Sequence, residues 1–141
     1  MCLYTKQWES KIAEEDITCY KVLTEDLKSP CYGQQYELGK LIKSELVLTS
    51  KPLYNCVNEG LHTYSDKGDA IRTVYSRWAI QNNWTDVYEI SAPIVVECVI
   101  PKGSEYYAGK PFVWLQTSIL YASAQLIPKK IVYDATENAK N

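Results

Sequence analysis

Residues able to carry acid–base, nucleophilic or metal chemistry are few and scattered in this chain of 141 residues. The chain has a single histidine, His62, and its five cysteines are Cys2, Cys19, Cys31, Cys56 and Cys98. No two of them form a C-x-x-C pair, and zinc needs closely spaced thiolates or imidazoles to fill its tetrahedral shell. The sequence therefore predicts neither a metal site nor a cofactor.

Catalytic arrangements have equally little support. A Cys–His or Ser-His-Asp arrangement would have to use His62, which has neither a local cysteine signature nor a G-x-S-x-G motif beside it. The carboxylates that could form a glycosidase pair are Glu59, Asp66, Glu89, Glu97 and Glu105, and their spacing favours no pair. No G-x-G-x-x-G or Walker loop is present. We predict no catalytic residue and favour a protein without turnover, with an enzyme that uses His62 as the alternative.

The aromatic composition is the unusual feature. Twelve tyrosines and four tryptophans stand against one phenylalanine. Tyrosine and tryptophan combine a flat apolar face with a polar edge, which suits sheet surfaces, interfaces and walls on which a ligand stacks. The composition is compatible with a tyrosine-rich sheet surface and with a ligand-binding wall.

Charge and chain ends restrict the partners and the compartment. The net charge is −2, whereas proteins that bind nucleic acid through its phosphates usually carry a basic excess. No segment has the length and apolar character of a membrane span or of a secretion signal. With scattered cysteines, we expect a cytoplasmic protein with reduced thiols and no nucleic-acid or membrane partner. A homo-oligomer is compatible with the sequence.

The hydrophobic pattern predicts the elements that would position a site. A β-rich segment at 17–23 predicts an early strand, and the apolar, β-branched run at 92–101 predicts a central one. Apolar residues recur at helical spacing over about 66–80, after an N-cap at Ser65 or Asp66. We predict an α+β fold: one domain over 1–141, with mostly antiparallel twisted sheets of short strands, one main central helix, and a polar tail at about 135–141 that frays.

Several short segments resemble small proteins of gut bacteria and their phages along nearly the whole chain. These segments cover residues 20–23, 36–40, 59–64, 100–104 and 121–123. That resemblance implies no activity.

Three further segments follow one another in an informative order. They are Gly60-Leu61-His62-Thr63-Tyr64, then Ser65-Asp66-Lys67-Gly68-Asp69-Ala70 with Tyr75, then 94–103. This order resembles the ADP-ribosyltransferase fold of poly(ADP-ribose) polymerase catalytic domains. Those enzymes have a Gly-aliphatic-aromatic strand, a Ser-Lys-Ser-Ala-x-Tyr helix start, and an apolar strand that ends at a Gly turn. The resemblance implies an ADP-ribosyltransferase-like fold.

The same resemblance implies roles for particular residues. In that family an aromatic residue of the helix segment stacks on nicotinamide, and Tyr64 or Tyr75 is the matching candidate. The family also has a glutamate near the start of a late strand, where this chain has no carboxylate over 121–127. Gln125 or Ser123 would hydrogen-bond ribose there without supplying the charge. The family's early His or Arg is absent, and Tyr20-Lys21 lies nearest to its place.

The candidate ligand-binding residues are Tyr64, Tyr75, Arg72, Arg77 and Gln125, followed by Lys21 and His62. Core packing for the tyrosines and a solvated helix face for the arginines are the alternative interpretations. We expect a non-catalytic protein that binds or sequesters a nucleotide-derived small molecule built on ADP-ribose or NAD. If the gene is viral, its role would be to sequester a host immune signal made from NAD. A divergent ADP-ribosyltransferase and a tyrosine- and tryptophan-rich interaction module are the alternatives.

Overall fold

The computed structural model describes residues 3–7, 9–29, 34–51, 54–74, 94–110 and 119–135. Within these ranges the chain forms one helix, over 67–74, and eleven strands. The strands are β1 (Leu3–Thr5), β2 (Lys11–Ile12), β3 (Ile17–Leu23), β4 (Ile42–Lys43), β5 (Val47–Lys51), β6 (Tyr54–Glu59), β7 (Leu61–Tyr64), β8 (Ile94–Ile100), β9 (Glu105–Gly109), β10 (Leu120–Ser123) and β11 (Gln125–Asp134).

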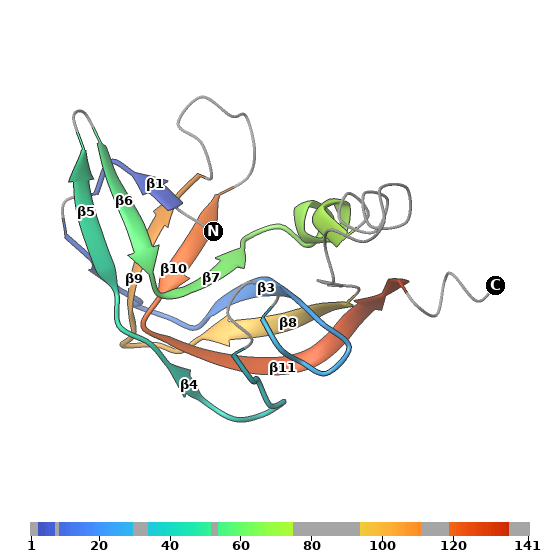
Figure 1. The fold of residues 1–141 in the computed structure, drawn as a ribbon. Helices are drawn as coiled ribbons and strands as arrows, with labels where there is room; N and C mark the ends of the chain where they lie inside the picture. Colours follow the sequence, from blue (N-terminus) through green and yellow to red (C-terminus); the bar gives the residue numbers. More distant parts are fainter. Residues whose placement is uncertain are drawn as a thin grey trace.

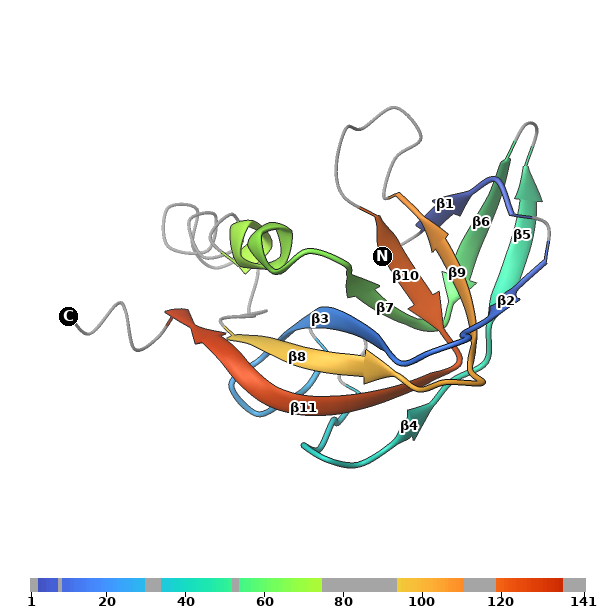
Figure 2. The ribbon, with the colours of Figure 1, turned by 180° about the vertical axis from the view of Figure 1, so that it is seen from behind.

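The strands form two antiparallel sheets. The larger has the order β2-β9-β10-β7-β3-β8-β11-β4, and the smaller has the order β1-β6-β5. In Figures 1 and 2 the helix lies on one side of the layer formed by β3, β8 and β11, and β4 lies on the other. The described chain is therefore mostly antiparallel sheet with one helix, as the α+β prediction requires.

The sheet made by β3, β8 and β11 separates two apolar clusters. Strands β3 and β8 pair along their whole length, so alternate side chains face opposite sides. Val95 on β8 packs with Ala70 and Val74 of the helix, whereas Cys98 and Ile100 belong to the cluster on the other side. All three β8 residues are fully buried. The central strand predicted from the run at 92–101 is confirmed as β8.

Strands β6 and β7 form one extended stretch that bends at Gly60. The φ angle of Gly60 is +135°, in a region that side-chain-bearing residues rarely adopt. Because of this bend, β6 pairs with β1 and β5, while β7 pairs with β10 and β3. Figure 1 shows that β1, β5 and β6 lie beside β9 and β10. A third apolar cluster, which includes Leu3 of β1 and Leu120 of β10, fills this half.

The predicted helix and tail are described only in part. The helix expected at about 66–80 spans 67–74 of the described residues, and 75–80 lie outside them. Residues 36–40, one of the segments in the first resemblance, form a turn, with Gly39 at a φ of +82°. The tail is described only to Ala135.

The cysteines are not all reduced. Cys19 and Cys98 are free and buried, but Cys56 is disulfide-bonded. The prediction of five free thiols is therefore wrong for Cys56. Scattered spacing along the chain carries no information about which cysteines a folded sheet brings together, and disulfide geometry depends on that proximity.

Candidate ligand-binding site

The place where β3 meets β7 brings together several of the residues singled out in the sequence. The two strands pair at Tyr20 and Tyr64. β3 pairs with β8 over its whole length on its other side, and β7 pairs with β10 over all four of its residues. The backbones of β3 and β7 therefore pair at one position only, Tyr20 with Tyr64. Next to it, the Lys21 side chain connects the two strands.

Tyr20 and Tyr64 form a cross-strand pair on the helix side of the sheet. Both are half-buried and pack against the cluster that contains Ala70 and Val74 of the helix. The Tyr64 hydroxyl lies 3.1 Å from Thr73 Oγ1, which fixes the ring against the helix. Directly opposed residues in an antiparallel pair lie close together. The two rings therefore provide aromatic surface at one spot, although Tyr20 is not among the seven predicted site residues.

Lys21 lies on the opposite side of the same sheet. Its ammonium donates a hydrogen bond to the His62 carbonyl oxygen over 2.8 Å, and it lies 5.8 Å from the centroid of the Tyr36 ring. The cation thus ties β3 to β7 where their backbone pairing has ended. A cation over an aromatic face gains electrostatic attraction. The structure joins Lys21 and His62 but directs Lys21 away from Tyr64.

His62 is held among backbone carbonyls. Its side chain is 8% exposed, with Nδ1 3.1 Å from the Gly60 oxygen and Nε2 3.3 Å from the Val57 oxygen. Burial, followed by the charge of Lys21, lowers the pKa of His62 to about 4. The neutral imidazole has one N–H, so it donates to one of these carbonyls only. Both ring nitrogens face backbone oxygens, which suits packing better than proton transfer.

The buried thiols next to this junction are also unsuited to nucleophilic chemistry. Cys19 and Cys98 are directly opposed on β3 and β8, and each is fully buried. Burial raises the pKa of Cys19 to about 11 and raises that of Cys98 further. The thiolate is the reactive form, so both groups are unreactive at neutral pH.

Arg72 and Gln125 are engaged in local contacts. Arg72 is exposed and forms an ion pair with Asp69 of its own helix, with Asp66 Oδ2 3.9 Å from its guanidinium. Gln125 accepts a hydrogen bond from the Ser104 hydroxyl over 3.2 Å at the start of β11. β8 lies between β11 and β3, so Gln125 is separated from Lys21.

Tyr75 and Arg77 lie outside the described residues. Of the seven predicted site residues, the structure places Lys21, His62 and Tyr64 at the β3–β7 junction. Arg72 is on the helix that follows β7, and Gln125 is at the start of β11.

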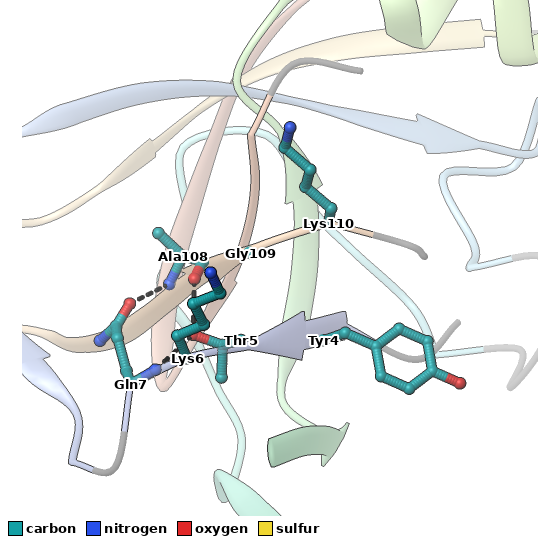
Figure 3. A pocket seen from close by; sticks show the side chains of 7 residues that line it. All are labelled: Tyr4, Thr5, Lys6, Gln7, Ala108, Gly109 and Lys110. Atoms are coloured by element: carbon teal, nitrogen blue, oxygen red, sulfur yellow. Dashed lines mark hydrogen bonds between the residues drawn. The ribbon is translucent and has the colours of Figure 1, made fainter. Parts of the chain in front are cut away.

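A groove that sequence reasoning missed lies at the crossing of β1 and the end of β9 (Figure 3). It is lined by residues 4–7 and 108–110 and has a volume of about 490 Å³. Its two walls are about a hundred residues apart in the chain, so no local motif indicates it. The nearest signal is Gly109, whose missing side chain allows the two backbones to approach.

Neither a protein-family model nor a curated protein nor a solved structure matches the chain. Across the described residues, no three His, Cys, Asp or Glu side chains are grouped so that they could hold a metal ion. No helix in the described ranges has the length and apolar character needed to cross a membrane.

Proposed function

We propose that the protein binds a nucleotide-derived small molecule built on ADP-ribose and does not turn it over. The observation that carries this proposal is the half-buried Tyr20–Tyr64 pair beside the helix. An aromatic face of this kind is suited to a stacked base or nicotinamide ring, and each stacked base contributes about 1–3 kcal/mol. Tyr64 is also one of the two residues, with Tyr75, to which the family resemblance assigns stacking.

The order of elements supports the same ligand class. Gly60 is followed by strand β7, by the helix at 67–74, and by the apolar strand β8. After β8 comes a turn at Gly103, whose φ is +89°. The ADP-ribosyltransferase-like fold, which we infer from the resemblance, has a strand, a helix and an apolar strand in this order.

The chemistry of the described residues favours binding without turnover. Cleavage of a glycosidic bond needs charge placed where the cation develops. The segment that forms β10 and starts β11 has no carboxylate over 121–125. His62 faces backbone oxygens with both ring nitrogens, and the thiols of Cys19 and Cys98 are buried. If the gene is viral, such a protein would sequester a host signal made from NAD.

Lys21 and His62 act in this proposal as positioning residues. The Lys21 ammonium holds the His62 carbonyl and so fixes β7 beside β3. Tyr64 lies two residues further along β7, where its ring is presented to the ligand. Loss of the Lys21 contact should therefore weaken binding indirectly, through the position of Tyr64.

Isothermal titration calorimetry with ADP-ribose tests the proposal. Tyr64→Leu removes the ring and should weaken binding about tenfold or more. Tyr64→Phe keeps the ring, loses the contact with Thr73 Oγ1 and should bind within about threefold of the wild type. Tyr106→Leu is the matched control, because Tyr106 is a partly buried tyrosine of β9 that contacts Tyr121 instead.

Two results would contradict this assignment. Equal affinity of Tyr64→Leu and the wild type would place the ligand elsewhere. No heat with ADP-ribose, its cyclic isomers or NAD would leave the interaction module as the better explanation. The exposed large apolar side chains that such a module would use are spread over separate elements, among them Ile12 on β2 and Ile131 on β11.

A further inference from the structure

The groove between β1 and β9 has a rigid floor. Tyr4 and Lys110 exchange two backbone hydrogen bonds, from the Tyr4 nitrogen over 2.8 Å and from the Lys110 nitrogen over 3.0 Å. The Thr5 hydroxyl donates to the Ala108 oxygen over 2.8 Å, and the Gln7 side-chain oxygen accepts from the Ala108 nitrogen over 2.7 Å. The floor is thus held by its own hydrogen bonds, and small-molecule sites are usually preformed in this way.

Gly109 makes this crossing possible. A Cβ atom at this position would overlap the Tyr4 carbonyl oxygen and would lie 2.7 Å from a methyl group of Leu3. A glycine in a strand often marks a place where another backbone approaches closely. The shape of the groove therefore depends on one residue that carries no functional group.

The charged groups that line the groove are both positive. They are Lys6 and Lys110, and none of the seven lining residues is acidic. In the described part of the chain neither ammonium is within 4.0 Å of a carboxylate. In Figure 3 the side chains of Lys6, which follows β1, and of Lys110, which follows β9, extend upward, and the Tyr4 ring extends away to the right. The groove is therefore lined by two cationic side chains, Lys6 and Lys110, although the net charge of the protein is −2.

We propose that this groove is a second binding site, which takes a small molecule carrying a diphosphate through Lys6 and Lys110. Lysine binds phosphate as a point charge, so two lysines around one groove match two linked phosphates. The volume of about 490 Å³ is within the range of small-molecule sites.

This site is independent of the proposed ADP-ribose site. Strand β10 lies between β9, which forms the groove, and β7, which carries Tyr64. Pyrophosphate has neither a base nor a ribose, so it reports on the lysines of the groove and not on the Tyr20–Tyr64 pair. Failure of one site can therefore be distinguished from failure of the other.

Calorimetry of the full chain with pyrophosphate and with ADP, at low and at raised salt, tests the second site. The Lys6→Gln/Lys110→Gln double variant should weaken binding of both probes about tenfold or more, and raised salt should weaken wild-type binding. Lys43→Gln is the matched control, because it removes the same charge from exposed β4, which is not part of the groove. Tyr64→Leu should leave the affinity for pyrophosphate unchanged.

The proposal fails if the wild type binds neither probe, or if the double variant binds them as the wild type does. An equal loss in Lys43→Gln would show diffuse attraction in place of a site. A single-stranded oligonucleotide that binds more tightly than ADP, with the loss confined to the double variant, would assign the groove to nucleic-acid backbone and would overturn the small-molecule assignment.

Discussion

His62 illustrates how surroundings determine the chemistry of a single residue. As the only imidazole of the chain it is the obvious candidate for acid–base work, and a lone histidine in the sequence gives no indication of its neighbours. In the fold it is buried between the Val57 and Gly60 carbonyls, with Lys21 bound to its own carbonyl. Desolvation disfavours the imidazolium more strongly than the two carbonyls favour it.

The lowered pKa of His62 predicts a specific dependence of stability on pH. The unfolded state takes up the proton near pH 6.5, whereas the folded state takes it up only near pH 4. The stabilisation is therefore complete above pH 6.5 and is lost as the pH falls toward 4. Between pH 7 and pH 5 the free energy of unfolding should fall by about 2 kcal/mol from this residue.

Urea unfolding of the wild type and of His62→Gln measures this contribution, because carboxylates titrate in both proteins and cancel in the difference. The wild type should lose more stability than the variant between pH 7 and pH 5. Identical pH profiles for the two proteins would show that His62 is not held neutral by burial.

Gly109 gives a second prediction for a single residue. Gly109→Ala should lower the free energy of unfolding by about 1–3 kcal/mol, because the added methyl overlaps the Tyr4 carbonyl oxygen. Gly68→Ala is the control: it lies inside the helix, where alanine is favoured over glycine by up to about 1 kcal/mol, and its nearest contact is a side-chain atom, Asp66 Oδ2 at 3.0 Å, and not backbone. Thermal unfolding distinguishes them, and equal stability of Gly109→Ala and the wild type would mean that the strands do not cross as described.

Among the elements, those with a strong local pattern are the ones that the sequence predicts well. The β-branched run around β8 and the segment of β3 form strands with nearly the predicted bounds, since both are buried in the middle of the sheet. β1, β2 and β4 have two or three residues each and were missed. Such short strands are specified by their partners across the sheet and not by their own sequence.

Strand β8 provides the prediction at this scale. Ile100→Ala should lower the free energy of unfolding by about 2–5 kcal/mol. The Ile100 side chain is fully buried in the apolar cluster on the face of the sheet opposite the helix. Ile131→Ala on β11 is the matched control; this side chain is 46% exposed, and its loss should change the stability by less than about 0.5 kcal/mol. Chemical denaturation of both variants measures the difference. A loss for Ile131→Ala equal to that for Ile100→Ala would contradict the assigned faces.

For the whole molecule, the bend at Gly60 and the crossing at Gly109 determine which residues meet. Lys21, His62 and Tyr64 are three of the seven candidate residues predicted from the sequence, and the fold places all three where β3 meets β7. Sequence reasoning did not identify Tyr20 as the partner of Tyr64, or the groove between Lys6 and Lys110. Both depend on strand pairing between distant segments, which local periodicity does not encode.

The cysteines give a prediction for the whole chain. Native protein should contain a disulfide through Cys56, and its intact mass should rise by two hydrogen atoms for each bridge on reduction. Cys19 and Cys98 should resist a thiol reagent until the protein unfolds, because both are fully buried. The mass of Cys56→Ser is the control for the bridge. Labelling of Cys19 in the native protein, or an unchanged wild-type mass on reduction, would contradict the described cysteine states.

The most direct test of the central claim follows NAD and ADP-ribose with the protein in one sample by ligand-observed proton NMR. The binding-without-turnover account predicts that the ADP-ribose signals broaden on addition of the Lys6→Gln/Lys110→Gln variant, which lacks the groove lysines, and recover when Tyr64→Leu is added to that variant. It also predicts that free nicotinamide does not accumulate over hours, because residues 121–125 include no Asp or Glu to stabilise the cation that forms during cleavage. Release of nicotinamide that scales with protein concentration, or ADP-ribose signals that stay sharp beside the wild type, would contradict it.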